Sequence, residues 1–408
     1  MQNKKERKVT TMNRYLLTSE SVTEGHPDKI CDQISDRLLD CYLMGDETSH
    51  VALETMVSKN TVFIAGEVSS KTKVDVVKEA RKVLLSIGYD RAEKGIDGNN
   101  CLVLTNINIQ SGDIAMGVSQ KDGVIGAGDQ GMMYGYASDE TANYMPLSID
   151  LAHQLTKRLT KVRKDNILPY LYPDGKSQVT VAYDEEGNVV NITDVVISAQ
   201  HADGVALEQL RKDIKREVID RVIPSEWMAP DINIHINPTG RFVIGGPLGD
   251  TGLTGRKLMV DTYGGIGKHG GGAFSGKDPT KVDRSSAYMA RYAAKNIVAA
   301  GLCKKCEVSL AYAIGVPRPV AVRVDTFGTE VVPIPLLCQA VEETFDFSVA
   351  AVLSHLGLAK VTYEPVAAYG HFGRTDISLP WERTDKAQEL REKVVTLLAE
   401  EIKKVTNK

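Results

Sequence analysis

The chain has 408 residues, of which 42% are hydrophobic, and its formal net charge is −4 at pH 7. This length suggests two or three domains with a sizeable core. The slight acidity argues against general nucleic-acid binding, because no domain-wide basic surface is implied. The six cysteines are scattered in mostly apolar settings, and no run is long enough to span a bilayer. We therefore expect a cytoplasmic protein with reduced thiols, in which any phosphate site is a local concentration of cations.

The first residues, Met1–Met12, are polar and basic without an apolar core, so we predict a disordered tail over residues 1–13 rather than a signal peptide. Beyond the tail, short strands and amphipathic helices alternate irregularly, which predicts an α+β fold. Strands are predicted over 51–57, 62–68, 101–107, 178–183, 189–198, 231–236, 307–315 and 320–326. Helices are predicted over 28–43, 73–87, 141–164, 204–222, 284–300, 335–343 and 386–405.

The first predicted helix begins with a polar cluster. Pro27 suits the first helical position, which places His26, Asp28 and Lys29 at the helix N-terminus. The amides and the dipole of that terminus attract anions. Helix capping alone accounts for Asp28, but it requires neither the imidazole nor the lysine. A metal-bridged phosphate would use all three side chains.

Two glutamates lie within apolar strand patterns, at Glu54 and Glu67. Strand glutamates ordinarily face solvent, whereas a half-buried carboxylate would indicate a cation or an ammonium group as partner. The segment that follows these strands, Asn108–Asp122, is polar and weakly periodic, which indicates a mobile loop or lid.

The middle of the chain carries turn signals. In Gly126–Gly131, Asp129 stands between glycines, where it would serve a turn or accept a hydrogen bond from an amine or a ribose. The segments Tyr172–Lys176 and Asp184–Asn188 predict two turns that bracket a hairpin strand. Further on, Asn237–Lys257 contains six glycines and ends in two cations. It is either a second part of a phosphate site or an unrelated solvated loop.

The most informative segment is 264–284, which holds seven glycines together with three lysines and an arginine, directly before a predicted helix. Backbone amides without Cβ obstruction and positive charge are what a nucleotide phosphate chain needs. The segment nearly matches a P-loop, but Asp278 stands where Ser or Thr would bind magnesium, and Pro279 follows. We therefore favour phosphate binding by another route over a plain surface loop.

Two further features of the sequence are weaker signals. Val260–Gly264 is echoed by Val324–Gly328, which hints at a duplicated strand and turn, although five residues do not establish a repeat. Cys303 and Cys306 form a single CxxC without a second pair or a nearby histidine, which argues against a zinc site.

Several of these segments together resemble the S-adenosylmethionine synthetase (methionine adenosyltransferase) family. Two of the segments, Gly126–Gly131 and Gly270–Asp278, are highly specific as a pair. The resemblance extends from residue 14 to the end of the chain. The segments are His26–Lys29, the hexapeptide Gly126–Gly131, Asp250–Lys257, the nonapeptide Gly270–Asp278 and Ala367–Arg374.

The resemblance implies conversion of ATP, L-methionine and water into S-adenosylmethionine, diphosphate and phosphate. It also implies three similar α+β subdomains, each a mixed sheet with helices, related by pseudo-threefold symmetry. The active site would lie between the subunits of a tight homodimer, commonly paired into a homotetramer, with no nucleic acid or membrane as partner. The expected parts are a tail (1–13), subdomains 14–112, 126–243 and 244–384, a mobile loop (113–125) and a C-terminal helix (385–408).

The resemblance also implies roles for individual residues. His26, Lys176, Arg256 and Lys277 would be catalytic. The ATP contacts would be His26, Asp174, Lys176, Arg241, Phe242, Asp250, Arg256, Lys257, Ala273 and Lys277. The methionine contacts would be Glu67, Gln110, Asp129, Asp250 and Lys281, and residues 108–121 would form the lid. Asp28 and Asp283 would bind Mg²⁺, with two ions per subunit, and Glu54 would bind one K⁺.

This chemistry suits a chain without an evident Ser/His/Asp or Cys/His arrangement. A thioether sulfur is a neutral nucleophile with no proton to lose, so its attack on C5′ of ATP needs no general base. The barrier lies in releasing tripolyphosphate, which lysines, arginine and magnesium must neutralise. Two other classes remain open at this point: an ATP-dependent kinase or ligase that uses the same loops, and a nucleotide sensor without turnover.

Overall fold

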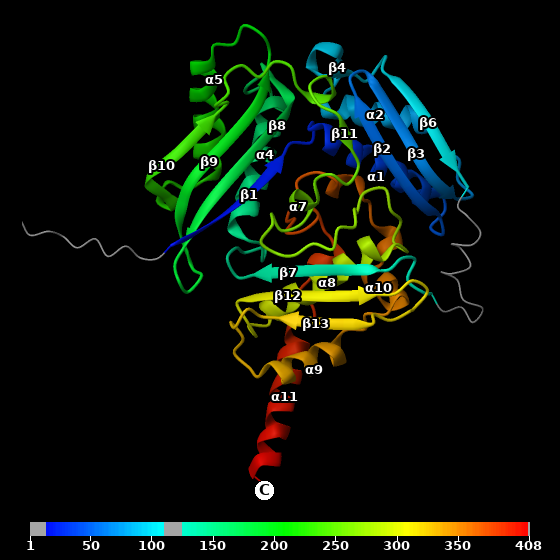
Figure 1. The fold of residues 1–408 in the computed structure, drawn as a ribbon, viewed down its shortest axis with the longest axis vertical. Coiled ribbons are helices and arrows are strands. Elements are labelled where there is room, and N and C mark those ends of the chain that lie inside the picture. The colour runs from blue at the N-terminus through cyan, green and yellow to red at the C-terminus, as the bar shows by residue number, and fades with distance from the viewer. Residues whose placement is uncertain (1–13, 110–124, 407–408) are drawn as a thin grey trace, which may run out of the picture.

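The computed structural model describes residues 14–109 and 125–406. Three β-sheets are arranged around the middle of the molecule, and the last helix extends away from them (Figure 1). The predicted tail and most of the predicted lid lie outside the described residues. The main strands are β1 (Tyr15–Val22), β2 (His50–Ser58), β3 (Thr61–Ser69), β6 (Leu102–Asn108), β7 (Gly131–Ser138), β8 (Leu171–Tyr183), β9 (Val189–His201), β10 (Met228–Ile236), β12 (Lys305–Tyr312) and β13 (Ala321–Asp325).

Besides these main strands, the described residues contain α-helices, short 3₁₀ and π segments, and three short strands. The helices are α1 (Pro27–Gly45), α2 (Val76–Ile87), α4 (Leu147–Lys164), α5 (Leu207–Ile214), α6 (Asp220–Val222), α7 (Leu258–Asp261), α8 (Val282–Ala299), α9 (Ile334–Thr344), α10 (Val349–Leu356) and α11 (Ala387–Thr406). The short strands are β4 (Asp90–Arg91), β5 (Ile96–Asp97) and β11 (Gly252–Leu253).

The three sheets are built on the same plan. In two of them an antiparallel hairpin, β2–β3 or β8–β9, continues into a parallel strand, β6 or β10. In the third sheet, the hairpin β12–β13 pairs with β7, and its three strands are antiparallel. A long helix precedes each hairpin: α1, α4 and α8 in turn. The predicted α+β fold of three similar units is therefore confirmed.

The units exchange their first strands in a cycle. Strand β1 pairs with β8 of the second unit, β7 pairs with β12 of the third, and β11 pairs with β2 of the first. Each sheet thus combines stretches of chain that are more than a hundred residues apart. Each unit gives its first strand to the next unit, as the predicted pseudo-threefold symmetry requires, and this exchange joins the three units into one body.

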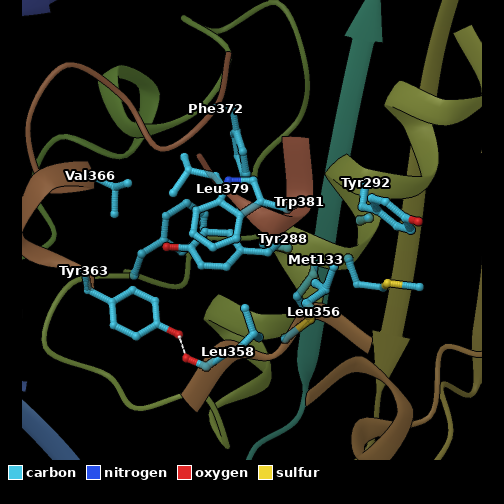
Figure 2. Close-up of a cluster of buried hydrophobic side chains, with 14 of the residues drawn as sticks. Met133, Tyr288, Tyr292, Leu356, Leu358, Tyr363, Val366, Phe372, Leu379 and Trp381 are labelled. Atoms are coloured by element: carbon cyan, nitrogen blue, oxygen red, sulfur yellow. Dashed lines mark hydrogen bonds between the residues drawn. The ribbon is translucent and has the colours of Figure 1, made fainter. Parts of the chain in front are cut away.

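Two hydrophobic cores support these sheets. One lies between the second sheet and α4 with α5, and the other is shared by the first and third units. In the shared core the ring of Tyr288 from α8 stacks on Trp381 at 3.8 Å between centroids, with Phe372 edge-on beside it (Figure 2). Buried aromatic pairs of this kind add to the stability that area burial provides.

Some local predictions are wrong. Tyr172–Lys176 is not a turn but part of the continuous strand β8, where the register shifts between Leu171 and Gly175. Strand β8 pairs with β9 at Leu171 and Gly175 and with β1 from Lys176 onward, and this pairing overrides the local Pro-Asp-Gly signal. The five-residue echo is also no duplication, because Val260–Gly264 contains the end of helix α7 whereas Val324–Gly328 contains the end of strand β13.

Candidate functional site

The first part of the site is the N-terminus of α1. His26 is the N-cap, and its Nδ1 accepts a hydrogen bond from the Asp28 amide at 3.1 Å. Both side chains are almost fully buried. Burial, with the neighbouring charges of Lys257 and Lys176, lowers the pKa of His26 to about 3. Because Nδ1 is an acceptor and the ring is neutral at pH 7, the ring proton lies on Nε2.

A glycine-rich loop is tied to this helix terminus through Asp28. The Leu253 amide donates to Asp28 Oδ1 at 3.0 Å, and Lys257 Nζ donates to Oδ2 at 2.5 Å. Arg256 Nε lies 3.5 Å from Oδ1. Burial raises the pKa of Asp28, but these hydrogen bonds outweigh it, and the net shift is downward. An ionised carboxylate therefore stands beside two cations.

The same face of α1 carries a row of four buried aspartates, spaced four residues apart, which we call the aspartate ladder. Their side chains accept backbone N–H groups from three separate segments: Leu253 and Gly255, then Gly276, then Tyr363 with Glu364. Like charges at this spacing repel one another, so a helix gains nothing from such a row by itself. Its members are Asp28, Asp32, Asp36 and Asp40.

The second part of the site is formed by the glycine-rich segment that leads into α8. Lys277 Nζ donates to Asp283 Oδ2 at 2.6 Å. Lys277 lines a cavity of about 270 Å³ together with Glu54, Glu67 and Ala273. Both glutamates lie on the outer face of the first sheet and are exposed. The cavity therefore joins the β2–β3 hairpin to a loop that lies more than 200 residues later in the sequence.

The two glycine-rich loops meet at α1. A Cβ atom at Gly255 would lie 2.5 Å from the Cβ of Ala273, so the loops are in contact there. Thr254 also lines the Lys277 cavity, and its hydroxyl is 2.9 Å from that of Ser35 on α1. The alternative of two unrelated solvated loops is therefore wrong.

A third group borders the helix terminus from the second sheet. Asp174 is buried in β8, and its Oδ2 accepts the Gly246 amide at 2.9 Å. Burial raises the pKa of Asp174 to about 6, with a smaller contribution from Asp250. Lys176 follows on the same strand, and its charge contributes to the lowered pKa of His26. Strand β8 thus brings Asp174 and Lys176 to the cluster around α1.

Other predicted residues lie apart or make different contacts. Arg241 is exposed and pairs with Asp203 at 2.9 Å. The Phe242 amide donates to His201 Nε2, and Lys281 pairs with the buried Asp278 at 2.7 Å. The Asp129 side chain accepts the backbone amide of the next residue, Gln130. A Cβ atom added at Gly131, two residues after Asp129, would lie 3.9 Å from Asp283 Oδ1. Gln110 lies outside the described residues.

The structure also adds side chains that sequence reasoning missed. The Ser275 hydroxyl is buried, lines the Lys277 cavity and has no hydrogen-bond partner in the described residues. Asp36 and Arg284 form a fully buried ion pair behind the same loop. The periodic row of aspartates was the one signal that could have pointed to Asp36. Ser275 carried no signal beyond its place among the glycines.

The described residues, 14–109 and 125–406, lack two features. They contain no helix that is long and apolar enough to cross a membrane. They also contain no group of three or more His, Cys, Asp or Glu side chains placed to hold a metal. Asp28 and Asp283 each lie beside a lysine, Lys257 and Lys277.

Comparison with protein families gives three successive matches. The model described as S-adenosylmethionine synthetase, N-terminal domain, matches residues 14–112. The central-domain model of the same synthetase matches residues 124–242, and its C-terminal-domain model matches residues 244–383. The matches cover most of the chain and all the residues described above as parts of the site.

Proposed function

Because this chain belongs to the S-adenosylmethionine synthetase family, whose members make S-adenosylmethionine from ATP and methionine, we propose how its own residues carry out the reaction. The methionine sulfur attacks C5′ of ATP, a C–S bond forms, and the C5′–O bond breaks. The sulfur becomes a sulfonium and tripolyphosphate leaves with the electron pair. In a second step, water cleaves the bound tripolyphosphate into diphosphate and phosphate.

The observation that carries this proposal is the convergence of the two glycine-rich loops on α1. It places Arg256 and Lys257 on one loop, next to the loop that carries Lys277. A leaving group that spreads charge over three phosphates needs cations distributed along a wall rather than one point charge. Fixed cations and amides stabilise that charge without reorganising during the reaction.

His26 acts in this scheme as a neutral hydrogen-bond donor. Its low pKa keeps it uncharged, and its Nδ1 is occupied by the Asp28 amide. The Nε2–H group is therefore the one that donates to the oxygen leaving C5′. Lys176, near the same ring, contacts the triphosphate. No residue takes a proton from the nucleophile, since a thioether has none to give.

The residues present suit the cations on which the family generally depends, Mg²⁺ and K⁺. Mg²⁺ is commonly held by one or two carboxylates together with substrate phosphates and water. Asp28 and Asp283, single carboxylates beside phosphate-binding lysines, fit that pattern. Glu54 and the unpartnered Ser275 hydroxyl line one cavity and offer oxygen atoms to K⁺. When bound, the cations neutralise phosphate charge.

The remaining predicted contacts are assigned to the substrates by the family resemblance. Glu67 lines the Lys277 cavity and suits the methionine ammonium group. The family resemblance assigns Asp129, Gln110 and Lys281 to the same substrate. The family resemblance assigns Arg241, Phe242, Asp250 and Asp174 to ATP. They contact the nucleoside in this proposal.

The site is completed by a second copy of the chain in this proposal. Met56, Phe63 and Leu104 are direct neighbours across β2, β3 and β6, and each exposes about two fifths or more of its surface. This apolar row lies beside Glu54 on the outer face of the sheet. Contiguous exposed apolar surface is typical of protein–protein interfaces and of ligand-binding grooves. A homodimer, paired into a tetramer, would cover it.

The reaction is tested with ATP that carries ¹⁸O at the 5′ bridging oxygen. Purified protein is incubated with this ATP and methionine, and the products are analysed by mass spectrometry. Cleavage of the C5′–O bond sends the label into diphosphate or phosphate and leaves none in S-adenosylmethionine. Formation of labelled ADP or AMP without a methionine adduct would instead support a kinase or ligase. ATP binding without turnover would support a sensor.

A further inference from the structure

We propose that the buried ion pair of Asp36 and Arg284 positions Lys277, so that turnover depends on two residues that do not touch the substrates. The inference rests on the proposed function, because it takes Lys277 as a contact of the phosphate chain. Asp36 belongs to the aspartate ladder of α1, and Arg284 lies in the first turn of α8. The pair therefore connects the central helices of the first and third units.

The pair is inaccessible to solvent and fixed in orientation. Arg284 Nη1 donates to Asp36 Oδ1 at 2.6 Å, and Nη2 donates to Oδ2 at 2.9 Å. Arg284 Nε donates to the Tyr288 hydroxyl at 3.0 Å, and the guanidinium lies 4.0 Å from the ring centroid of Tyr363. A two-pronged contact between planar groups specifies direction as well as distance.

Both partners also hold the backbone on either side of Lys277. Asp36 Oδ1 accepts the Gly276 amide at 2.9 Å. Arg284 Nη1 donates to the carbonyl oxygens of Phe274 at 3.0 Å and Lys277 at 3.2 Å. One ion pair therefore sets the path of the chain from residue 274 to residue 277.

Strand β2 closes the opposite side of this loop. The Leu53 amide donates to the Gly276 carbonyl at 3.0 Å, and the Asp278 amide donates to the Val51 carbonyl at 3.0 Å. Gly276 has a φ of +80°, and a Cβ there would lie 1.9 Å from the Leu53 carbonyl oxygen. The loop is thus held between β2 and the ion pair, and loss of the pair frees its inner side.

The expected consequence concerns rate. Lys277 Nζ is 2.6 Å from Asp283, the residue directly before Arg284, so movement of either end disturbs both side chains. A displacement of about 1 Å at a reacting centre can cost about 100-fold in rate. We therefore expect Asp36→Asn to lower kcat by about 100-fold, with a smaller change in KM for methionine.

Asp40→Asn is the matched control for this variant. It makes the same chemical change on the next member of the ladder, where the carboxylate accepts the Tyr363 and Glu364 amides instead. It is expected to lower the melting temperature while kcat stays unchanged. All rates are measured below the melting temperature of each variant. If Asp36→Asn does not fold, Asp36→Leu/Arg284→Met removes both charges together and leaves no unpaired charge in the core.

A double-mutant cycle with Lys277→Ala separates positioning from stability. If Asp36 acts through Lys277, the loss of kcat caused by Asp36→Asn largely disappears in the Lys277→Ala background. A full loss in both backgrounds would overturn the positioning role. An unchanged rate in Lys277→Ala alone would instead refute the proposed site, so the two failures are distinguishable.

Amide hydrogen exchange provides a readout that does not depend on activity. The Gly276 amide is expected to exchange much faster in Asp36→Asn than in the unaltered protein, and to keep its slow exchange in Asp40→Asn. Unchanged protection of Gly276 in a folded Asp36→Asn protein would overturn the inference whatever the rates are.

Discussion

Lys277 and Asp283 show at the scale of single residues how function can be separated from stability. Their side chains pair at 2.6 Å and are about one fifth exposed. Such partly exposed pairs contribute about 0 to 1 kcal/mol to folding. Interactions with charge that develops in a transition state are worth far more in a preorganised site.

Lys277→Ala or Asp283→Asn is therefore expected to lower kcat by about 100- to 1000-fold while unfolding free energy changes by less than about 1 kcal/mol. Steady-state rates and urea denaturation of the same preparations measure the two effects. Parallel losses of rate and stability would indicate a structural role for the pair.

Glu54 provides a prediction about monovalent cations. If its carboxylate binds K⁺, the unaltered protein is stimulated by KCl, and Glu54→Gln loses that stimulation while it still turns over slowly. Rates measured in KCl and in NaCl at equal ionic strength test this. The same KCl dependence in both proteins would assign the cation elsewhere.

Asp40 gives a prediction about pH and stability. Burial raises the pKa of Asp40 from 3.8 to about 7. The folded state thus binds this proton more tightly than the unfolded chain does, so the stability linked to it is present below about pH 4 and is lost as pH rises through about 7. Asp40→Asn removes this titrating group. Its unfolding free energy should therefore rise relative to that of the unaltered protein as the pH is raised from 4 to 8. A difference independent of pH would contradict the raised pKa.

At the scale of residues, the sequence predicted the charged residues of the glycine-rich loops but not the buried ion pair that fixes one of these loops in place. Lys257 and Lys277 were found because glycines and lysines in one segment indicate phosphate binding. Asp36 and Arg284 were not, because a buried ion pair between two helices is visible only after both helices are placed. Arg241 was grouped with the site by resemblance, although its side chain pairs with Asp203.

At the scale of elements, the glycines of β7 explain why this strand was not predicted. Glycine disfavours strands because it has no side chain to pack and loses more entropy on folding. Here Gly135 is required, since a Cβ would lie 1.9 Å from the carbonyl carbon of Ala290 in α8. Strand β1 was missed because apolar residues do not alternate along it: Ser19 and Ser21 are buried, whereas Tyr15 and Leu16 are exposed. The hairpin strands were predicted because β-branched residues alternate along them.

Gly135→Ala is accordingly expected to push β7 away from α8 and to cost about 3 kcal/mol of unfolding free energy, the upper part of the usual range for overpacking. Gly131→Ala, on the same strand, is the control, since the added Cβ would approach a carbon only at the flexible end of Met133, at 3.3 Å. Urea denaturation compares the two variants. Equal stability would show that β7 and α8 can separate without cost.

At the scale of the whole molecule, the apolar row on the first sheet predicts assembly. Phe63→Glu places a charge in the centre of that row and is expected to yield monomers with little activity, although Phe63 is not among the proposed substrate contacts. Leu85→Glu is the control, because Leu85 is equally exposed, at 39%, but lies on α2. Light scattering after gel filtration measures mass, and the same fractions are assayed. A fully active Phe63→Glu monomer would refute a site shared between subunits.

The cyclic exchange of first strands has a consequence for biosynthesis. The sheet of the N-terminal unit receives its edge strand only when β11, at residues 252–253, has been made. Its own first strand, β1, must wait for β8. A nascent polypeptide therefore cannot complete its units one after another as it leaves the ribosome, and truncation after the first or second unit leaves an incomplete sheet for quality control to recognise.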